Sequence, residues 1–285
     1  MKYNVADDLK FISKCFSLSF DKLSKAMDVP KENLSRIING QLEPSTELLE
    51  KIYGFIYDQN LNFNDVKIQS YKRNHDVILV HGSKEELIGD ISLDHSREHV
   101  DFGVGFYAGD NYQQALDFVC QTKKGSVYVL DVDYSDLNIL NLEVSLDWML
   151  LIALNRGKLE EYSNSSKYRE LTDLISKYDV IIAPIADNRM FTTIDDFVSS
   201  AISSEQAIHA IKDLSLGKQI VFKTMKAIKR INVLERLYVS KSEKEAAKIL
   251  KIQKINDADD FISNAYKKYV RQGKYIEEIF SDEND

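Results

Sequence analysis

Glycine and proline are scarce in this chain of 285 residues, and they are unevenly placed. Of the eleven glycines five fall between Gly82 and Gly109, and two of the three prolines, Pro30 and Pro44, lie near the N-terminus. Because these two residue types interrupt regular elements, long stretches elsewhere are free to form helices and strands. The chain therefore divides into an N-terminal part punctuated by proline and a later segment rich in glycine.

Composition limits the class of protein. With 44% apolar and 29% charged residues the chain can bury a real core, and its length favours two domains of unequal size. The net charge of -8 argues against general binding of polyanions. Cys15 and Cys120 lack the spacing of a disulfide framework or a zinc site, so we expect both to be buried and expect no metal. No apolar run is long enough for export or for crossing a membrane, so we expect a cytoplasmic protein without membrane contact.

Three short apolar stripes at helical spacing predict three helices near the N-terminus. They run from Phe20 to Met27, from Leu34 to Ile38 and from Leu48 to Ile52. Pro30 is placed to begin the second helix, and Asn39-Gly40 is placed to end it.

This pattern resembles the helix-turn-helix of the phage-repressor (Cro-like, XRE) family from about Leu9 to Asn60. The resemblance implies a recognition helix over Pro30 to Asn39 that binds double-stranded DNA. The residues expected at the DNA are Lys31, Asn33, Ser35, Arg36 and Gln41. Residues 1–70 carry nine basic against ten acidic side chains, which is little positive charge for DNA binding. Binding as a homodimer, or use as a protein docking module, are the alternatives.

Two motifs follow a polar stretch, Asn60 to Asn74, which we expect to link domains. The apolar run Val77 to Val80 predicts a buried strand that leads into His81-Gly82-Ser83. About twenty residues later the chain reads DFGVGFY, from Asp101 to Tyr107, and a helix is expected over Gln113 to Val119. A glycine at the end of a strand lets a ligand approach the backbone closely.

Together these segments resemble the ADP-ribosyltransferase fold of the diphtheria-toxin and poly(ADP-ribose) polymerase branch. Its members carry a strand ending in HG[ST], followed by GxGxYF and a helix with a small residue, here Ala115. The order of HGS, DFGxGFY, the segment Trp148 to Arg156, YDVIIAPIADNRMF and KQIVFKTMKAI is similar to an uncharacterised bacterial family assigned to that fold. The resemblance covers about Asp76 to Arg236. It implies an α+β chain in which a split β-sandwich with helices follows an all-α helix-turn-helix bundle.

The resemblance also implies NAD as the substrate. His81 would hydrogen-bond the adenosine ribose, the backbone of Gly82 would hold the nicotinamide carboxamide, and Ser83 would contact the nicotinamide side. Tyr107 would stack on the nicotinamide ring, and Gly105 belongs to the same cofactor-binding motif. Fixing the ribose and the leaving amide favours cleavage of the glycosidic bond.

The third catalytic residue departs from the family pattern. Where the branch carries a glutamate at the start of a late strand, GKQIVFKT offers Gln219, which accepts a hydrogen bond but brings no charge. Glu205 is the competing candidate, although a capping box of Ser203 with Gln206 explains it equally well as part of a helix start. Asn188 and Arg189 are expected on a loop, where they bind NAD phosphates or the acceptor, or form a plain turn.

The C-terminal part is basic and helical. From Gly217 to Arg236 six basic residues stand against one acid, either as a patch for an acidic or nucleic-acid acceptor or as a solvated face. Helices are expected from Glu243 to Ile252 and from Ala258 to Tyr269. The expected domains are residues 1–70, 71–239 and a helical tail over 240–285.

Two functions follow. The first is an NAD-dependent mono-ADP-ribosyltransferase acting on an unknown protein or nucleic acid, a toxin or antiphage effector that its helix-turn-helix tethers or autoregulates. The second is a non-catalytic transcriptional regulator whose C-terminal part binds NAD or ADP-ribose, which the absence of the glutamate favours.

Overall fold

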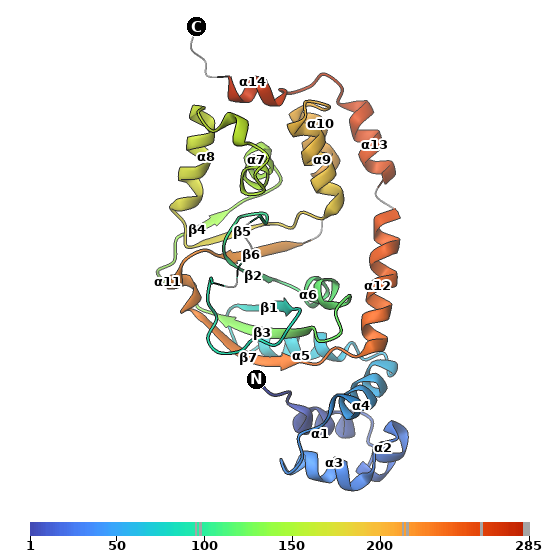
Figure 1. The fold of residues 1–285 in the computed structure, drawn as a ribbon. Helices are drawn as coiled ribbons and strands as arrows, with labels where there is room; N and C mark the ends of the chain where they lie inside the picture. The colour runs from blue at the N-terminus through green and yellow to red at the C-terminus, as the bar shows by residue number, and fades with distance from the viewer. Residues whose placement is uncertain (95, 97–98, 213, 215–216, 257–258, 282–285) are drawn as a thin grey trace. The chain divides into compact units, whose positions relative to one another are not determined.

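The computed structural model describes residues 1–94, 96, 99–212, 214, 217–256 and 259–281. Within them the protein is α+β, as predicted, with helices at both ends of the chain and strands between (Figure 1). The helices are α1 (Val5–Cys15), α2 (Phe20–Met27), α3 (Lys31–Ile38), α4 (Thr46–Asp58), α5 (Phe63–Lys72), α6 (Tyr112–Val119), α7 (Leu146–Asn155), α8 (Ser166–Ser176), α9 (Asn188–Val198), α10 (Ser204–Lys212), α11 (Met225–Ile228), α12 (Lys241–Asn256), α13 (Asp259–Lys268) and α14 (Ile276–Phe280). The strands are β1 (Ile78–Ser83), β2 (Phe106–Gly109), β3 (Ser126–Val132), β4 (Ile139–Asn141), β5 (Val180–Pro184), β6 (Lys218–Phe222) and β7 (Ile231–Leu237).

The chain forms two compact units that alternate along the sequence. The first unit comprises Met1–Asp90, Asn111–Asp133 and Asn232–Lys251. The second unit comprises Ile91–Asp110, Tyr134–Ile231 and Ile252–Asp285. The domain boundaries expected at residues 70 and 239 stay a prediction.

The three helices predicted near the N-terminus are confirmed as α2, α3 and α4. Ser19 caps α2 by accepting a hydrogen bond from the backbone N–H of Lys22, and Ser45 caps α4 in the same way. Pro30 directly precedes α3, and Gly40 follows its end with a φ of 69°, a left-handed conformation that favours glycine.

Apolar stripes of these helices meet in one buried cluster. Leu9 and Ile12 of α1, Leu23 of α2, Leu34 of α3 and Ile52 of α4 are fully buried there. Each stripe repeats every three or four residues, so one face of each short helix is covered by the others. Packing of these faces, rather than helix propensity, stabilises helices of this length.

Two expectations about this part of the chain are wrong. The stretch expected as a polar link contains helix α5, because Phe63 and Ile68 bury against the rest of the first unit. Cys15 is exposed at the end of α1, whereas Cys120 is buried as expected. Lys14 and Cys15, the last two residues of α1, are both exposed, so the Cys15 side chain gains nothing from burial.

The strands of the first unit carry the HGS motif. Strand β1 pairs antiparallel with β3, which places His81 opposite Tyr128, and β7 lies beside β3. Helices α5 and α6 supply Ile68, Leu116 and Val119 to the apolar cluster that also contains Val80 of β1.

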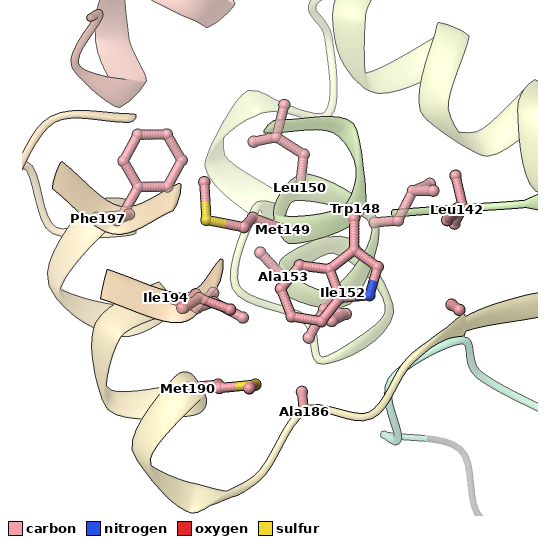
Figure 2. Packing of buried hydrophobic residues seen from close by; sticks show 14 of the residues in the cluster. Leu142, Trp148, Met149, Leu150, Ile152, Ala153, Ala186, Met190, Ile194 and Phe197 are labelled. Carbon is pink, nitrogen blue, oxygen red and sulfur yellow. The ribbon is translucent and has the colours of Figure 1, made fainter. Parts of the chain in front are cut away.

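The second unit holds four strands in the order β4-β5-β6-β2. Strands β4 and β5 are parallel, while β5 with β6 and β6 with β2 are antiparallel. Helix α7 is buried almost all round, with Trp148 and Ile152 fully covered. Figure 2 shows Met149 and Ala153 of α7 on the side of α9, which contributes Ile194 and Phe197 to the same core. This core supports the strands that carry the candidate site.

A second kind of contact in the first unit is polar and buried. Asn64 of α5 donates from Nδ2 to the hydroxyl of Tyr112 at 2.8 Å and to Glu243 Oε2 at 3.4 Å, while Tyr112 donates to Glu243 Oε1 at 2.7 Å. Burial raises the pKa of Glu243 to about 7, although the hydrogen bonds from Tyr112 and Asn64 act in the opposite direction.

Replacing Glu243→Gln tests this burial. Between pH 4.5 and about 7 the folded chain holds a proton at Glu243 that the unfolded chain has released, so the free energy of unfolding falls as the pH rises. In Glu243→Gln this contribution, a decrease of roughly 1 kcal/mol in unfolding free energy per pH unit, should be absent. Urea unfolding at pH 5, 6 and 7 measures it. Glu245→Gln, exposed on the same helix, should keep it. Identical pH dependence in wild type and Glu243→Gln would contradict the assignment.

Candidate functional site

The HGS motif lies at the end of β1 in the first unit. The ring of His81 lies 6.4 Å from that of Tyr128 on β3, at a tilt of 42°, and Ser83 is paired with Ser126. The hydroxyl of Tyr128 accepts a hydrogen bond from the backbone N–H of Leu87 at 2.9 Å. His81 and Ser83 are half-buried, so both are held by the strand while remaining partly accessible.

Gly82 has a packing role that the sequence did not indicate. A Cβ at this position would lie 2.7 Å from the backbone oxygen of Ala115 and 3.2 Å from Val119 Cγ1. Helix α6 therefore crosses β1 closely, and the absence of a side chain at Gly82 permits that approach. On this side of the strand a helix, not a ligand, occupies the space that the glycine opens.

In the second unit the structure brings Tyr107 and Gln219 onto neighbouring strands. Strand β2 pairs antiparallel with β6, so that Tyr107 is opposite Val221 and Gly109 is opposite Gln219. Residues directly opposite one another share a face of the sheet, as do residues two apart on one strand. Tyr107 and Gln219 are therefore diagonal neighbours on one face of the sheet.

The hydroxyl of Tyr107 is fixed at the turn before β2. It donates a hydrogen bond to the carbonyl of Gly103 at 2.8 Å and accepts one from the backbone N–H of Phe102 at 3.2 Å. Burial raises the pKa of Tyr107 well above its usual range. The ring is thus held in one orientation, and its hydroxyl stays neutral.

Gln219 is 7% exposed and its amide is engaged. Nε2 donates to Asp101 Oδ2 at 2.9 Å and to the carbonyl of Pro184 at 3.2 Å. These contacts join β6 to the turn before β2 and to the end of β5.

Asp101 is the buried charge of this site, with 8% of its surface exposed. Burial raises the pKa of Asp101, while the Gln219 amide, the Arg156 guanidinium and the backbone N–H of Ala186 lower it. Arg156 Nε lies 3.5 Å from Asp101 Oδ1, at ion-pair distance, and has no hydrogen-bond partner among the described residues. The guanidinium lies over the ring of Phe191, 3.3 Å from its centroid.

Lys223 turns inward at the end of β6. Its ammonium donates to the carbonyl of Phe102, and burial lowers the pKa of Lys223 to about 8. Most other members of the basic run have acidic partners, which favours paired cations over one open basic surface. These pairs are Lys218 with Glu143, Lys226 with Asp179, Arg230 with Asp136 and, in the first unit, Arg236 with Glu86.

The remaining predicted site residues lie at helix starts. Glu205 is in the first turn of α10, 3.5 Å from His209 Nε2, and Ser203 with Gln206 forms the expected capping box. The loop expected at 188–189 is wrong, because both residues belong to the first turn of α9. Asp187 caps this helix and pairs with Arg189 at 2.5 Å, and the side chain of Asn188 lies outside the described part of the chain.

Helix α3 presents the predicted DNA-binding residues to solvent. Lys31, Ser35 and Arg36 are exposed, as is Gln41 just beyond the helix, while Asn33 is half-buried. Lys31 forms an ion pair with Asp21 of α2 at 2.6 Å. The carboxylate of Asp21 therefore offsets the positive charge of Lys31 on this exposed face.

Sequence reasoning missed Asp101, Arg156 and Lys223 as site residues. All three lie within the motifs that carry the resemblance. Their positions in those motifs were the only signal in the sequence that could have marked them as candidates. Their grouping depends on contacts across more than fifty residues of sequence, which no local pattern indicates.

Other kinds of site find no support in the part of the chain that the structure describes. No group of three or more His, Cys, Asp or Glu side chains there could hold a metal ion. None of the described helices is both long and apolar enough to traverse a bilayer.

Comparison with known proteins identifies the family. The model of a family described as a protein of unknown function (DUF3990) matches residues 77–233, more than half of the chain, and the protein belongs to this family. The match spans both motifs and Gln219. No curated protein and no solved structure matches the chain.

The glycine before β2 provides a test of how tightly this site is built. A Cβ at Gly103, where φ is 68°, would lie 2.7 Å from Asn155 Oδ1, and Asn155 is itself held by a hydrogen bond to Leu151. Gly157 has a similar φ of 72° but its nearest contact would be 3.4 Å. We expect Gly157→Ala to cost about 1 kcal/mol of unfolding free energy from the backbone alone, and Gly103→Ala to cost at least about 1 kcal/mol more. If urea unfolding gave the same loss of stability for Gly103→Ala and Gly157→Ala, the Asn155 side chain would be able to move away without cost, contrary to this expectation.

Proposed function

We propose that this protein is an NAD-dependent mono-ADP-ribosyltransferase that modifies a protein or nucleic acid in the cytoplasm. The observation that carries the proposal is the position of Gln219, buried at the start of β6 and diagonal to Tyr107 on one face of the sheet. The resemblance assigns these two residues to the nicotinamide ribose and the nicotinamide ring. Their placement on neighbouring strands supports that assignment.

The chemistry follows from the residue types. Loss of nicotinamide leaves oxocarbenium character on the ribose, so a site gains by holding the ribose hydroxyls and by placing negative charge nearby. Gln219 can accept a hydrogen bond from a hydroxyl, and Tyr107 offers a rigid aromatic face. The resemblance adds His81, Gly82 and Ser83 as NAD-binding residues.

A non-catalytic regulator that binds NAD or ADP-ribose is the second candidate. It is favoured by one observation, the neutral side chain at 219 where the branch carries a glutamate. Two other predicted site residues give weaker support to either function. Arg189 is paired with Asp187, and Glu205 lies in the first turn of a helix.

Labelled NAD separates the two candidates. We expect the purified full chain with cell lysate to release nicotinamide and to transfer label to a macromolecule. Gln219→Ala should lower the rate by about a hundredfold, whereas Gln121→Ala, an exposed matched change, should not.

An absence of release and of label, with NAD still raising the unfolding temperature, would favour the regulator. An absence of all three responses would reject both candidates.

The N-terminal helices are proposed to bind double-stranded DNA through α3, as a homodimer because one copy carries little positive charge. Such binding would tether or autoregulate the enzyme, which suits a toxin or antiphage effector. The exposure of Ser35 and Arg36 on α3 supports the proposal.

A shift assay on the upstream region of its own gene tests the DNA contact. Arg36→Ala should weaken binding by about tenfold or more. Arg73→Ala, which removes the same charge from an exposed position after α5, should change it little. Binding that is unchanged in Arg36→Ala and in Lys31→Ala would remove α3 as the recognition helix.

A further inference from the structure

The amide of Gln219 can face its surroundings in only one way. A glutamine side chain has two N–H donors and one acceptor oxygen. Two acceptors lie against it, Asp101 Oδ2 at 2.9 Å and the carbonyl of Pro184 at 3.2 Å. The reversed amide would direct its oxygen at both of them and leave both without this donor. Nε2 is therefore used up, and Oε1 is the atom left to meet a ligand.

Asp101 does more than satisfy a donor. Its carboxylate lies one hydrogen bond away from Gln219, so the negative charge that a glutamate would place on β6 comes instead from the turn before β2. The Arg156 guanidinium and the backbone N–H of Ala186 stabilise the ionised form of this buried group. A hydrogen bond to a charged group is also stronger than one between neutral partners.

We propose that Asp101 is a positioning residue that holds Gln219 as an obligatory hydrogen-bond acceptor for a ribose hydroxyl and supplies the negative charge of the pair. The inference rests on the proposed function and deepens it. Asp101 and Gln219 together do the work of the single glutamate of the branch, with the acceptor oxygen on one residue and the charge on the other.

A direct consequence is that restoring the glutamate alone is harmful. Gln219→Glu places a second carboxylate at hydrogen-bond distance from Asp101, and two carboxylates this close cannot both be ionised. Exchanging the two groups, Asp101→Asn with Gln219→Glu, keeps one amide, one carboxylate and the hydrogen bond between them. Pro184 then loses its donor and Arg156 loses its ion-pair partner, so the recovery is incomplete.

Four proteins form the test: wild type, Asp101→Asn, Gln219→Glu and the exchanged pair. We expect each single change to lower kcat for nicotinamide release by about tenfold or more, with KM for NAD changed less than about threefold. The exchanged pair should recover at least about tenfold over the slower single variant. Asp173→Asn, the same change on the exposed side of α8, should match wild type, and urea unfolding of every variant shows that each is folded.

Two results would overturn the proposal while leaving the proposed function intact: Gln219→Glu alone faster than wild type, or an exchanged pair no better than the single variants. A purely structural role would appear as recovery of stability without recovery of kcat, and would also overturn it. If wild type neither releases nicotinamide nor is stabilised against unfolding by NAD, the proposed function fails and the catalytic role of the pair fails with it.

Discussion

A carboxylate buried away from water costs several kcal/mol unless hydrogen bonds and opposite charge replace its hydration. In the second unit Asp101 imposes this requirement, and three distant segments meet it. Gln219 comes from the start of β6, Arg156 from the end of α7, and the backbone N–H of Ala186 from the connection between β5 and α9. The contacts that stabilise the Asp101 carboxylate thus hold the turn before β2 against β6, the strand that carries Gln219.

The first unit uses the same physics at a different place. Lys67 of α5 lies between Asp8 of α1, at 2.6 Å, and Glu235 of β7, at 2.5 Å, and Tyr53 of α4 donates to Asp8 at 2.5 Å. One cation between two buried carboxylates leaves a net negative charge. Burial raises the pKa of Glu235, and the nearby carboxylate of Asp8 acts in the same direction. Helices α1, α4 and α5 are thereby joined to a strand by polar contacts as well as by their apolar faces.

Prediction succeeded where one segment holds enough information by itself. The helices α2, α3 and α4 follow from apolar spacing and from the flanking proline and glycine, and the strands β1 and β6 follow from continuous β-branched runs. It failed at α5, whose polar composition hid two buried side chains, and at the start of α9. In both cases the deciding contact comes from elsewhere in the chain, because a helix face is stabilised by what covers it.

The α+β class, the two motifs and the neutral residue at 219 were all predicted or read from the amino-acid sequence alone. That Gln219 has a carboxylate beside it was decided only by the tertiary structure. The partner, Asp101, lies 118 positions away, and the charge of a side chain does not depend on sequence distance but on what surrounds it in space. In the folded chain the neutral amide of Gln219 is hydrogen-bonded to the carboxylate of Asp101, which lies in the turn before β2.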